Sequence, residues 1–160
     1  MNAKAAFAER RSVEQVELGA ELCPRFDASG LMPVIVQEST TRMILMLGYM
    51  NEAALRLTFE TRQAHFWSRT RQAIWRKGEH SGFTQLVDAL AVDDDQDALI
   101  LKVRLEGPGS CHVGYYSCFY RDVDLDRAAQ GRADCLTKTE PAPAFDAGKV
   151  YEGLPNPTLL

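Results

Sequence analysis

Two short segments of this chain concentrate side chains that can bind metal ions and activate water. The acidic segment has four carboxylates in five positions, Asp93-Asp94-Asp95-Gln96-Asp97. The cysteine segment, residues 111–118, begins with Cys111 and His112 and ends with Cys118. Carboxylate oxygens suit a hard cation such as Mg²⁺, whereas thiolates and imidazoles suit Zn²⁺. These residue types predict a metal-dependent enzyme whose active site combines the two segments.

A solvated acidic turn is the more frequent explanation for a run of aspartates. Two features favour a cation site here. The acidic segment follows a strand, predicted over 83–92, with apolar residues on both faces, so it begins close to the core. In a tight turn Asp93, Asp95 and Asp97 converge, as alternate ligands do in a calcium loop. The same alternation points Asp94 to the opposite side, toward another element or another subunit.

The cysteine segment is open to two interpretations. Its spacing matches no common zinc finger, so two buried thiols beside a surface histidine explain it as well as a zinc site does. His112 has an unperturbed pKa of about 6.5, which suits proton transfer near neutral pH. Cys23 and Cys135 have no ligand-type neighbours in the sequence and are expected to be ordinary thiols.

A basic and aromatic region precedes the acidic segment. Arg69 and Arg71 are expected on one face of a strand, where their guanidinium groups suit phosphate. Lys77 and the loop through Ser81 and Gly82 can supply further donors. Nucleic-acid binding is the alternative, but a net charge of −4 and so small a patch favour a small phosphorylated ligand.

The elements that must position these residues follow from hydrophobic patterning. Ser12 and Gln15 form a capping-box pattern that predicts a short helix ending before Pro24. Asn51 is a helix N-cap candidate. The other expected elements are a hairpin of 33–38 and 43–48, a helix over 52–61, strands at 64–68 and 74–75, and a strand at 83–92 paired with 98–105. We interpret 83–92 as a central strand or one that crosses a subunit interface.

These elements predict a single-domain α+β fold, mainly antiparallel sheet with a few short helices. The 160 residues suffice for one domain with a hydrophobic core. No apolar run approaches the roughly 18 residues of a membrane helix, and the charged N-terminus lacks a secretory pattern. We therefore expect a cytoplasmic protein with no membrane partner, whose four cysteines are thiols or metal ligands.

Several stretches, in one order, resemble phosphoribosyl-AMP cyclohydrolase of histidine biosynthesis. They are FDASGLMP at 26–33, MLGYMN at 46–51, FWSRTR at 66–71, WRKGE at 75–79, SG at 81–82, the acidic segment, CH at 111–112 and SCFYR at 117–121. The resemblance divides the chain into an N-terminal extension with a short helix (1–25), a catalytic domain (26–121) and a surface C-terminal tail (122–160).

The resemblance implies an intertwined homodimer that hydrolyses the N1–C6 bond of the adenine ring of 1-(5-phosphoribosyl)-AMP. Mg²⁺ would be bound by the alternate aspartates, Asp93, Asp95 and Asp97. Zn²⁺ or another divalent metal would be bound by Cys111 and Cys118, and would lower the pKa of a water toward about 7 for attack on C6. His112 would transfer the proton. The substrate phosphate would be bound with the help of Arg69, Arg71, Lys77, Ser81 and Gly82.

The chain departs from the family at three positions. The family's third zinc ligand is a cysteine donated across the dimer, but position 94 is Asp. Asp can ligate zinc through oxygen, and it makes the site more open to Fe²⁺, Co²⁺ or Mn²⁺. His80 and Phe83 replace the family's Thr and Asn, and His80 is either a replacement ligand or base or a loop histidine without a metal role.

These departures indicate a divergent paralogue. We hypothesise that it is adapted to scarce zinc, which stoichiometric, tightly held zinc would contradict. Two alternative functions stay open from the sequence. One is a hydrolase of the same fold that acts on another purine-like nucleotide. The other is a non-catalytic protein that binds metal or nucleotide.

Overall fold

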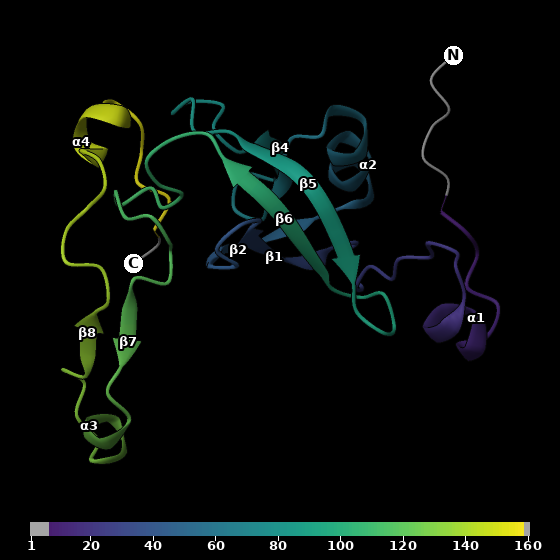
Figure 1. Cartoon of the computed structure of the whole chain (residues 1–160), viewed down its shortest axis with the longest axis horizontal. Coiled ribbons are helices and arrows are strands. Elements are labelled where there is room, and N and C mark those ends of the chain that lie inside the picture. The colour runs from purple at the N-terminus through teal and green to yellow at the C-terminus, as the bar shows by residue number, and fades with distance from the viewer. Residues whose placement is uncertain (1–6, 159–160) are drawn as a thin grey trace.

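The computed structural model describes residues 7–158. Its centre is a four-stranded sheet in the order β2-β1-β6-β5, shown in Figure 1. The four strands are β1 (Met32–Glu38), β2 (Ile44–Met50), β5 (Gln85–Val92) and β6 (Leu99–Leu105). Beside it lie α2 (Glu52–Thr61) and a two-stranded sheet of β3 (His65–Ser68) and β4 (Ala73–Arg76). The predicted α+β fold with mainly antiparallel pairing is confirmed.

Strand pairing follows the predicted hairpins with one addition. The pairs β1–β2 and β5–β6 are antiparallel, as expected. β1 and β6 also pair in parallel, with Val34 opposite Leu99, and no local sequence signal predicted this contact between distant segments. β5 is therefore an edge strand of the sheet. The first alternative, a central strand, was wrong, and the second, a strand that crosses a subunit interface, stays a prediction. Asp88 and Ala89, in the middle of β5, are exposed.

The hydrophobic core lies on one face of the sheet. Alternate residues of β1, among them Val34 and Val36, are fully buried with Leu101 of β6 and with apolar residues of α2 and β3. This alternation is what a sheet with one covered face requires. The opposite face carries a row in which Ile35 pairs with Leu47 on one side and Ile100 on the other. Leu47 is 48% exposed, so the described part of the chain leaves this apolar row partly uncovered.

The N-terminal helix α1 (Val13–Leu18) begins as predicted, because the Ser12 hydroxyl accepts the Gln15 N–H at 3.1 Å. It ends at Leu18, earlier than the predicted limit at Pro24, with Gly19 as its C-cap. Within residues 7–158 no helix has the length and apolarity needed to cross a bilayer.

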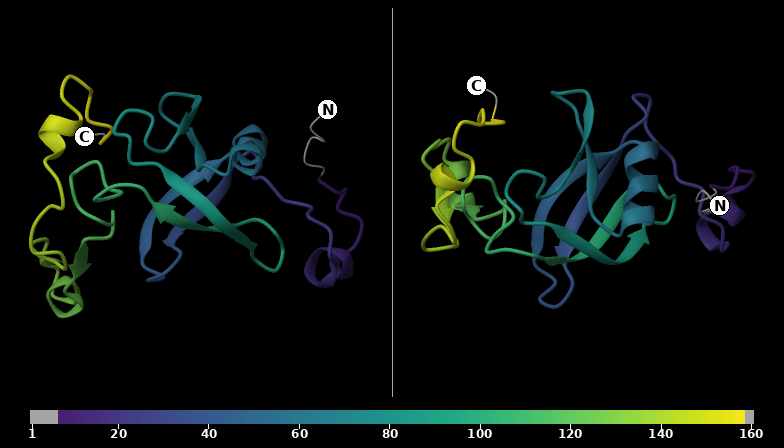
Figure 2. Two further views of the ribbon diagram at one scale, coloured as in Figure 1. Left: turned by 45° about the horizontal axis from the view of Figure 1, so that its top comes forward. Right: turned by 90° about the horizontal axis from the view of Figure 1, so that it is seen from above.

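The segment after β6 contains more structure than the predicted surface tail. A second small sheet pairs β7 (Arg121–Val123) with β8 (Leu136–Lys138). The short helix α3 (Leu125–Ala129) connects these two strands, and a second short helix, α4 (Ala147–Val150), comes after β8. Figure 2 shows that this C-terminal part and α1 lie at opposite ends of the central sheet. The sheet therefore separates the two ends of the chain.

We predict that Leu101→Ala lowers the free energy of unfolding by about 2–5 kcal/mol, because it leaves a cavity in the core beneath β6. Chemical denaturation measures the change. Lys102→Ala is the matched control, because the neighbouring Lys102 is exposed, and it should cost less than about 0.5 kcal/mol. Equal losses in the two variants would contradict the assignment of the core face.

Candidate active site

The acidic segment forms the turn between β5 and β6. Oδ1 of Asp93 accepts the N–H groups of Asp97 at 2.9 Å and Ala98 at 3.0 Å, which folds the chain back on itself. Gln96 takes a left-handed backbone conformation, with φ of 57°, to complete the reversal. As predicted, the alternate aspartates converge. One carboxylate oxygen from each of Asp93, Asp95 and Asp97 lies within 4.8 Å of the others.

This arrangement fits a hard divalent cation. Oxygens bound to one Mg²⁺ at about 2.1 Å lie no more than about 4.2 Å apart, so small side-chain rotations suffice to close the site. Asp94 is exposed and is not among the converging carboxylates. Arg25 meets the cluster from outside, with its guanidinium 3.1 Å from Asp95 and hydrogen-bonded to Asp97. That hydrogen bond lowers the pKa of Asp97.

The cysteine segment is a compact loop anchored to β2. The N–H of Cys118 donates to the Leu45 carbonyl at 2.8 Å, and the Ser117 hydroxyl donates to the Ile44 carbonyl at 2.7 Å. The N–H of Cys111 donates to the Tyr115 carbonyl at 3.1 Å, which turns the loop back on itself. These bonds bring the two predicted thiol ligands together at one end of the sheet.

The two thiols interact as a pair. A hydrogen bond from Cys118 lowers the pKa of Cys111 to about 6, with further help from a backbone hydrogen bond and from the charge of Lys77. The same interaction raises the pKa of Cys118, because its proton is shared with the neighbouring thiolate. The pair therefore holds one negative charge near neutral pH even before any metal binds.

Lys77 lies beneath the thiols. Its side chain is buried, with 7% of the residue exposed, and Nζ donates to the Ser110 carbonyl at 2.5 Å. Burial lowers the pKa of Lys77, and the nearby charges of Cys118 and Cys111 oppose that change. Gln85, also fully buried, donates to the Ser110 hydroxyl at 3.1 Å. The ammonium group thus faces the cysteine segment, rather than the surface where the predicted phosphate patch was expected.

His112, the residue after Cys111, has a buried ring nitrogen. Its Nε2 is buried and has no hydrogen-bond partner among the described residues. Burial and the charge of Lys77 lower the pKa of His112, and a hydrogen bond with Asn156 partly opposes them. The imidazole is therefore neutral at pH 7 and its free nitrogen can accept a proton or a ligand.

The C-terminal segment completes the cysteine site. The carboxylate of Glu140 accepts the N–H groups of Tyr116 at 2.8 Å and Ser117 at 3.0 Å, immediately before Cys118. Phe145 packs edge-on against Phe83, with ring centroids 5.0 Å apart. The phenylalanine at 83, one of the departures from the resembled family, is thus explained by packing against this segment.

β6 keeps the two candidate metal sites apart. The acidic segment precedes this seven-residue strand and the cysteine segment follows it. An extended strand of that length spans roughly 20 Å, and Figures 1 and 2 place the two segments at opposite ends of the sheet. One chain therefore does not bring its own aspartates to its own cysteines.

Arg69 and Arg71 do not share a strand face, so the prediction of their placement on a strand was wrong. Arg69 and Arg71 lie in the turn between β3 and β4. The Arg69 guanidinium stacks over the Tyr49 ring at 4.1 Å, and Arg71 lies 3.7 Å from Glu79. The loop after β4 carries the remaining predicted residues, Ser81 and Gly82, and the exposed His80.

The part of the chain that holds both segments matches the family model of phosphoribosyl-AMP cyclohydrolase over residues 46–120. A curated phosphoribosyl-AMP cyclohydrolase of Chloroherpeton thalassium is 47% identical over 127 residues, covering 79% of this chain and 85% of the relative. This chain belongs to the phosphoribosyl-AMP cyclohydrolase family. Relatives with the same name in Brucella anthropi and Brucella canis are 51% and 56% identical, covering 74% and 68% of this chain and 89% and 78% of the relatives.

The sequence did not predict the roles of three residues that contact or belong to the acidic and cysteine segments of this cyclohydrolase. Arg25 and Glu140 come from outside 46–120, and each reaches its site only through the tertiary fold. Gln96 is buried although it lies in an acidic turn. A lone Gln among four aspartates was a usable signal for Gln96, whereas nothing in the local sequence distinguished Arg25 or Glu140 from ordinary surface charges.

We predict that the Cys111 thiol of the metal-free protein ionises with a midpoint near pH 6. The ultraviolet absorbance of the thiolate measures this titration. Because the pKa of Cys111 is lowered, the thiolate is present above that pH and is lost as the pH falls through it. Cys118→Ala removes the largest cause, so the midpoint should rise toward the ordinary value of 9.0. Cys135→Ala is the control and should leave the midpoint unchanged. A wild-type titration confined to the ordinary thiol range would refute the paired-thiol geometry.

Proposed function

We propose that this chain hydrolyses the N1–C6 bond of the adenine ring of phosphoribosyl-AMP, a step of histidine biosynthesis. The observation that carries the proposal is the meeting of Cys111 and Cys118 in one loop, where His112, next to Cys111 in the chain, has a buried Nε2 with no hydrogen-bond partner in residues 7–158. All three residues lie within the part of the chain that the family model matches. The names of the relatives supply the substrate and the reaction.

The cysteine segment is the proposed site of a transition metal. Two sulfurs in mutual contact, one of them ionised near neutral pH, suit Zn²⁺ or a related divalent ion. Bound there, such an ion would supply a Lewis acid that lowers the pKa of water toward about 7. Lys77 offsets the negative charge of the thiolates from within the protein, and Glu140 holds the backbone that carries Cys118.

His112 is the proposed base. Its lowered pKa keeps the imidazole neutral, so Nε2 can take a proton from the attacking water. Water oxygen adds to C6 of the neutral imino ring, one water proton ends on the exocyclic nitrogen and the other on N1 as the N1–C6 bond breaks, and C6 becomes a carboxamide carbon. His112 can return the proton to N1, so that no net proton is consumed.

The acidic segment is the proposed Mg²⁺ site and holds a substrate phosphate through that ion. Its three converging carboxylates provide the oxygen ligands that Mg²⁺ prefers. The predicted basic contributors, Arg69 and Arg71 with Ser81 and Gly82, stay proposed phosphate ligands on the surface. Lys77 is less suited to that role, because its ammonium group is buried against Ser110.

A homodimer would bring the two sites together. The partly uncovered apolar row of Ile35, Leu47 and Ile100 offers a surface for a second copy. In such a dimer the acidic segment of one subunit can lie at the cysteine segment of the other. The partner subunit's Asp94, pointing away from the Mg²⁺ cluster, would then add an oxygen ligand to Cys111 and Cys118. An oxygen in that position favours Mn²⁺, Fe²⁺ or Co²⁺ relative to a third thiolate.

Ring opening of phosphoribosyl-AMP should be measured on metal-stripped protein with Zn²⁺, Mn²⁺, Fe²⁺ and Co²⁺ returned separately, each with Mg²⁺. We predict activity in the wild type and a loss of about a thousandfold or more in Cys111→Ala, because that variant lacks a metal ligand. Cys135→Ala is the matched control and should keep full activity. Activity retained by a correctly folded Cys111→Ala protein would exclude the role assigned to the thiols.

We predict that Leu47→Asp converts a dimer into monomers and abolishes ring opening, because a carboxylate in an apolar interface costs several kcal/mol when desolvated. Light scattering coupled to size exclusion measures the mass. Leu125→Asp is the control, because Leu125 is 77% exposed on α3 and lies outside the apolar row. A fully active Leu47→Asp monomer would argue against a shared site.

A further inference from the structure

A groove lies between the α1 segment and the acidic segment. It is an open surface groove of about 420 Å³, and its lining includes Asp95 and three arginines, Arg10, Arg11 and Arg25. Ligand sites for small molecules begin at about 300 Å³, so a phosphate with its ribose fits in this volume. The groove opens beside the converging carboxylates, which places basic side chains next to the proposed Mg²⁺ site.

Arg25 is the arginine that joins the groove to the carboxylates. Its guanidinium contacts Asp95, which lines the groove, and Asp97. The Arg25 side chain is 54% exposed, so it can rotate without disturbing packing. Arg10 and Arg11 are held by other partners, the Cys23 carbonyl at 2.6 Å and the Glu21 carboxylate at 2.7 Å.

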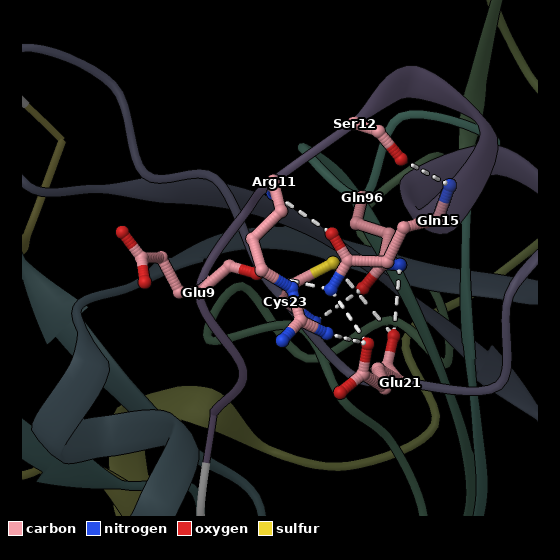
Figure 3. A network of polar contacts seen from close by, with 7 residues as sticks. All are labelled: Glu9, Arg11, Ser12, Gln15, Glu21, Cys23 and Gln96. Carbon is pink, nitrogen blue, oxygen red and sulfur yellow. Dashed lines mark hydrogen bonds and ion pairs between the residues drawn. The ribbon is translucent and has the colours of Figure 1, made fainter.

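The backbone around Arg25 is fixed by the buried Gln96 side chain, shown in Figure 3. Its Oε1 accepts the Cys23 N–H at 2.8 Å, and its Nε2 donates to the Val16 carbonyl at 3.0 Å. The Gln96 carbonyl accepts the Arg25 N–H at 2.8 Å. These bonds fix the position of the N-terminal segment relative to the acidic segment. The exposed Arg25 side chain is then the group that is free to change its conformation.

Charge balance indicates what that side chain does. Three carboxylates repel one another, and without a cation Arg25 is their nearest counterion. A divalent cation among the same oxygens would neutralise two of the three charges and weaken the hold on the guanidinium. The freed guanidinium would remain beside the cation, where the doubly charged phosphate of a nucleotide needs a second positive partner.

We propose that Arg25 is a phosphate-binding residue of the active site, held by Asp95 and Asp97 until a divalent cation displaces it toward the substrate phosphate. This inference rests on the proposed function, which assigns the cation to the acidic segment. It predicts opposite effects of one substitution on two ligands. Without the guanidinium, the cation no longer competes with Arg25 for the carboxylates and binds more tightly. The phosphate loses a positive partner and binds more weakly.

The experiment compares wild type, Arg25→Gln and Arg104→Gln as full-length proteins. Mn²⁺ binding is measured by titration calorimetry without nucleotide, and AMP binding is measured at saturating Mn²⁺. Asp95→Asn identifies which Mn²⁺ site belongs to the acidic segment. Arg104 pairs with Asp88 at 2.9 Å on the β5–β6 ribbon and is equally exposed, so its variant controls for the loss of a surface ion pair.

We expect Arg25→Gln to bind Mn²⁺ about three- to fivefold more tightly, as loss of an exposed competing ion pair allows, and AMP about tenfold more weakly. Arg104→Gln should match wild type in both. Weaker binding of both ligands would mean a structural role for Arg25 and would overturn the proposal, as would unchanged Mn²⁺ affinity or unchanged AMP affinity.

Wild-type ring opening, measured in parallel, separates the two ideas. Ring opening without the opposite changes refutes only the role of Arg25. If Asp95→Asn binds Mn²⁺ as wild type does, the acidic segment is not the cation site, which refutes the role of Arg25 and the assignment of Mg²⁺ to that segment but leaves ring opening at the cysteine segment to be judged by the activity measurement.

Discussion

The geometry of this protein depends on one extended strand. β6 joins the acidic segment to the cysteine segment and cannot shorten, because it is hydrogen-bonded to β1 on one side and β5 on the other. At about 3.3 Å per residue it holds the two ligand sets roughly 20 Å apart. The two segments at the ends of this strand therefore do not meet within a single chain. In the proposed homodimer, each strand would bring its acidic end to the cysteine end of the other.

The acidic segment and the cysteine segment are each organised locally by backbone hydrogen bonds and contacted by a distant segment. Asp93 closes the turn that gathers the carboxylates, and the N-terminal segment supplies Arg25 to them. β2 anchors Cys118, and the C-terminal segment supplies Glu140. The buried Lys77 sits where its charge lowers the pKa of Cys111. The two ends of the chain, which lie outside the part matched by the family model, thus contribute to sites that the matched part positions.

Local sequence patterns predicted the elements well and their long-range relations poorly. Ser12 and Asn51 cap the helices that their sequence context predicted, and the strand runs fall close to their expected limits. The convergence of alternate aspartates followed from turn geometry. The parallel pairing of β1 with β6 and the edge position of β5 depend on contacts between distant residues, which periodicity does not encode. For the same reason Arg25 and Glu140 could not be assigned, and Lys77 was expected at the surface.

The most direct test of a site shared between chains is subunit complementation. Asp95→Asn and Cys111→Ala proteins, each inactive alone, are mixed under conditions that exchange subunits, and ring opening of phosphoribosyl-AMP is measured. If each site takes its aspartates from one chain and its cysteines from the other, mixed dimers contain one intact site, and activity should return to roughly a quarter of the wild-type value. If the mixture stays inactive although mixed dimers are present, each site is built from a single chain and the account is contradicted.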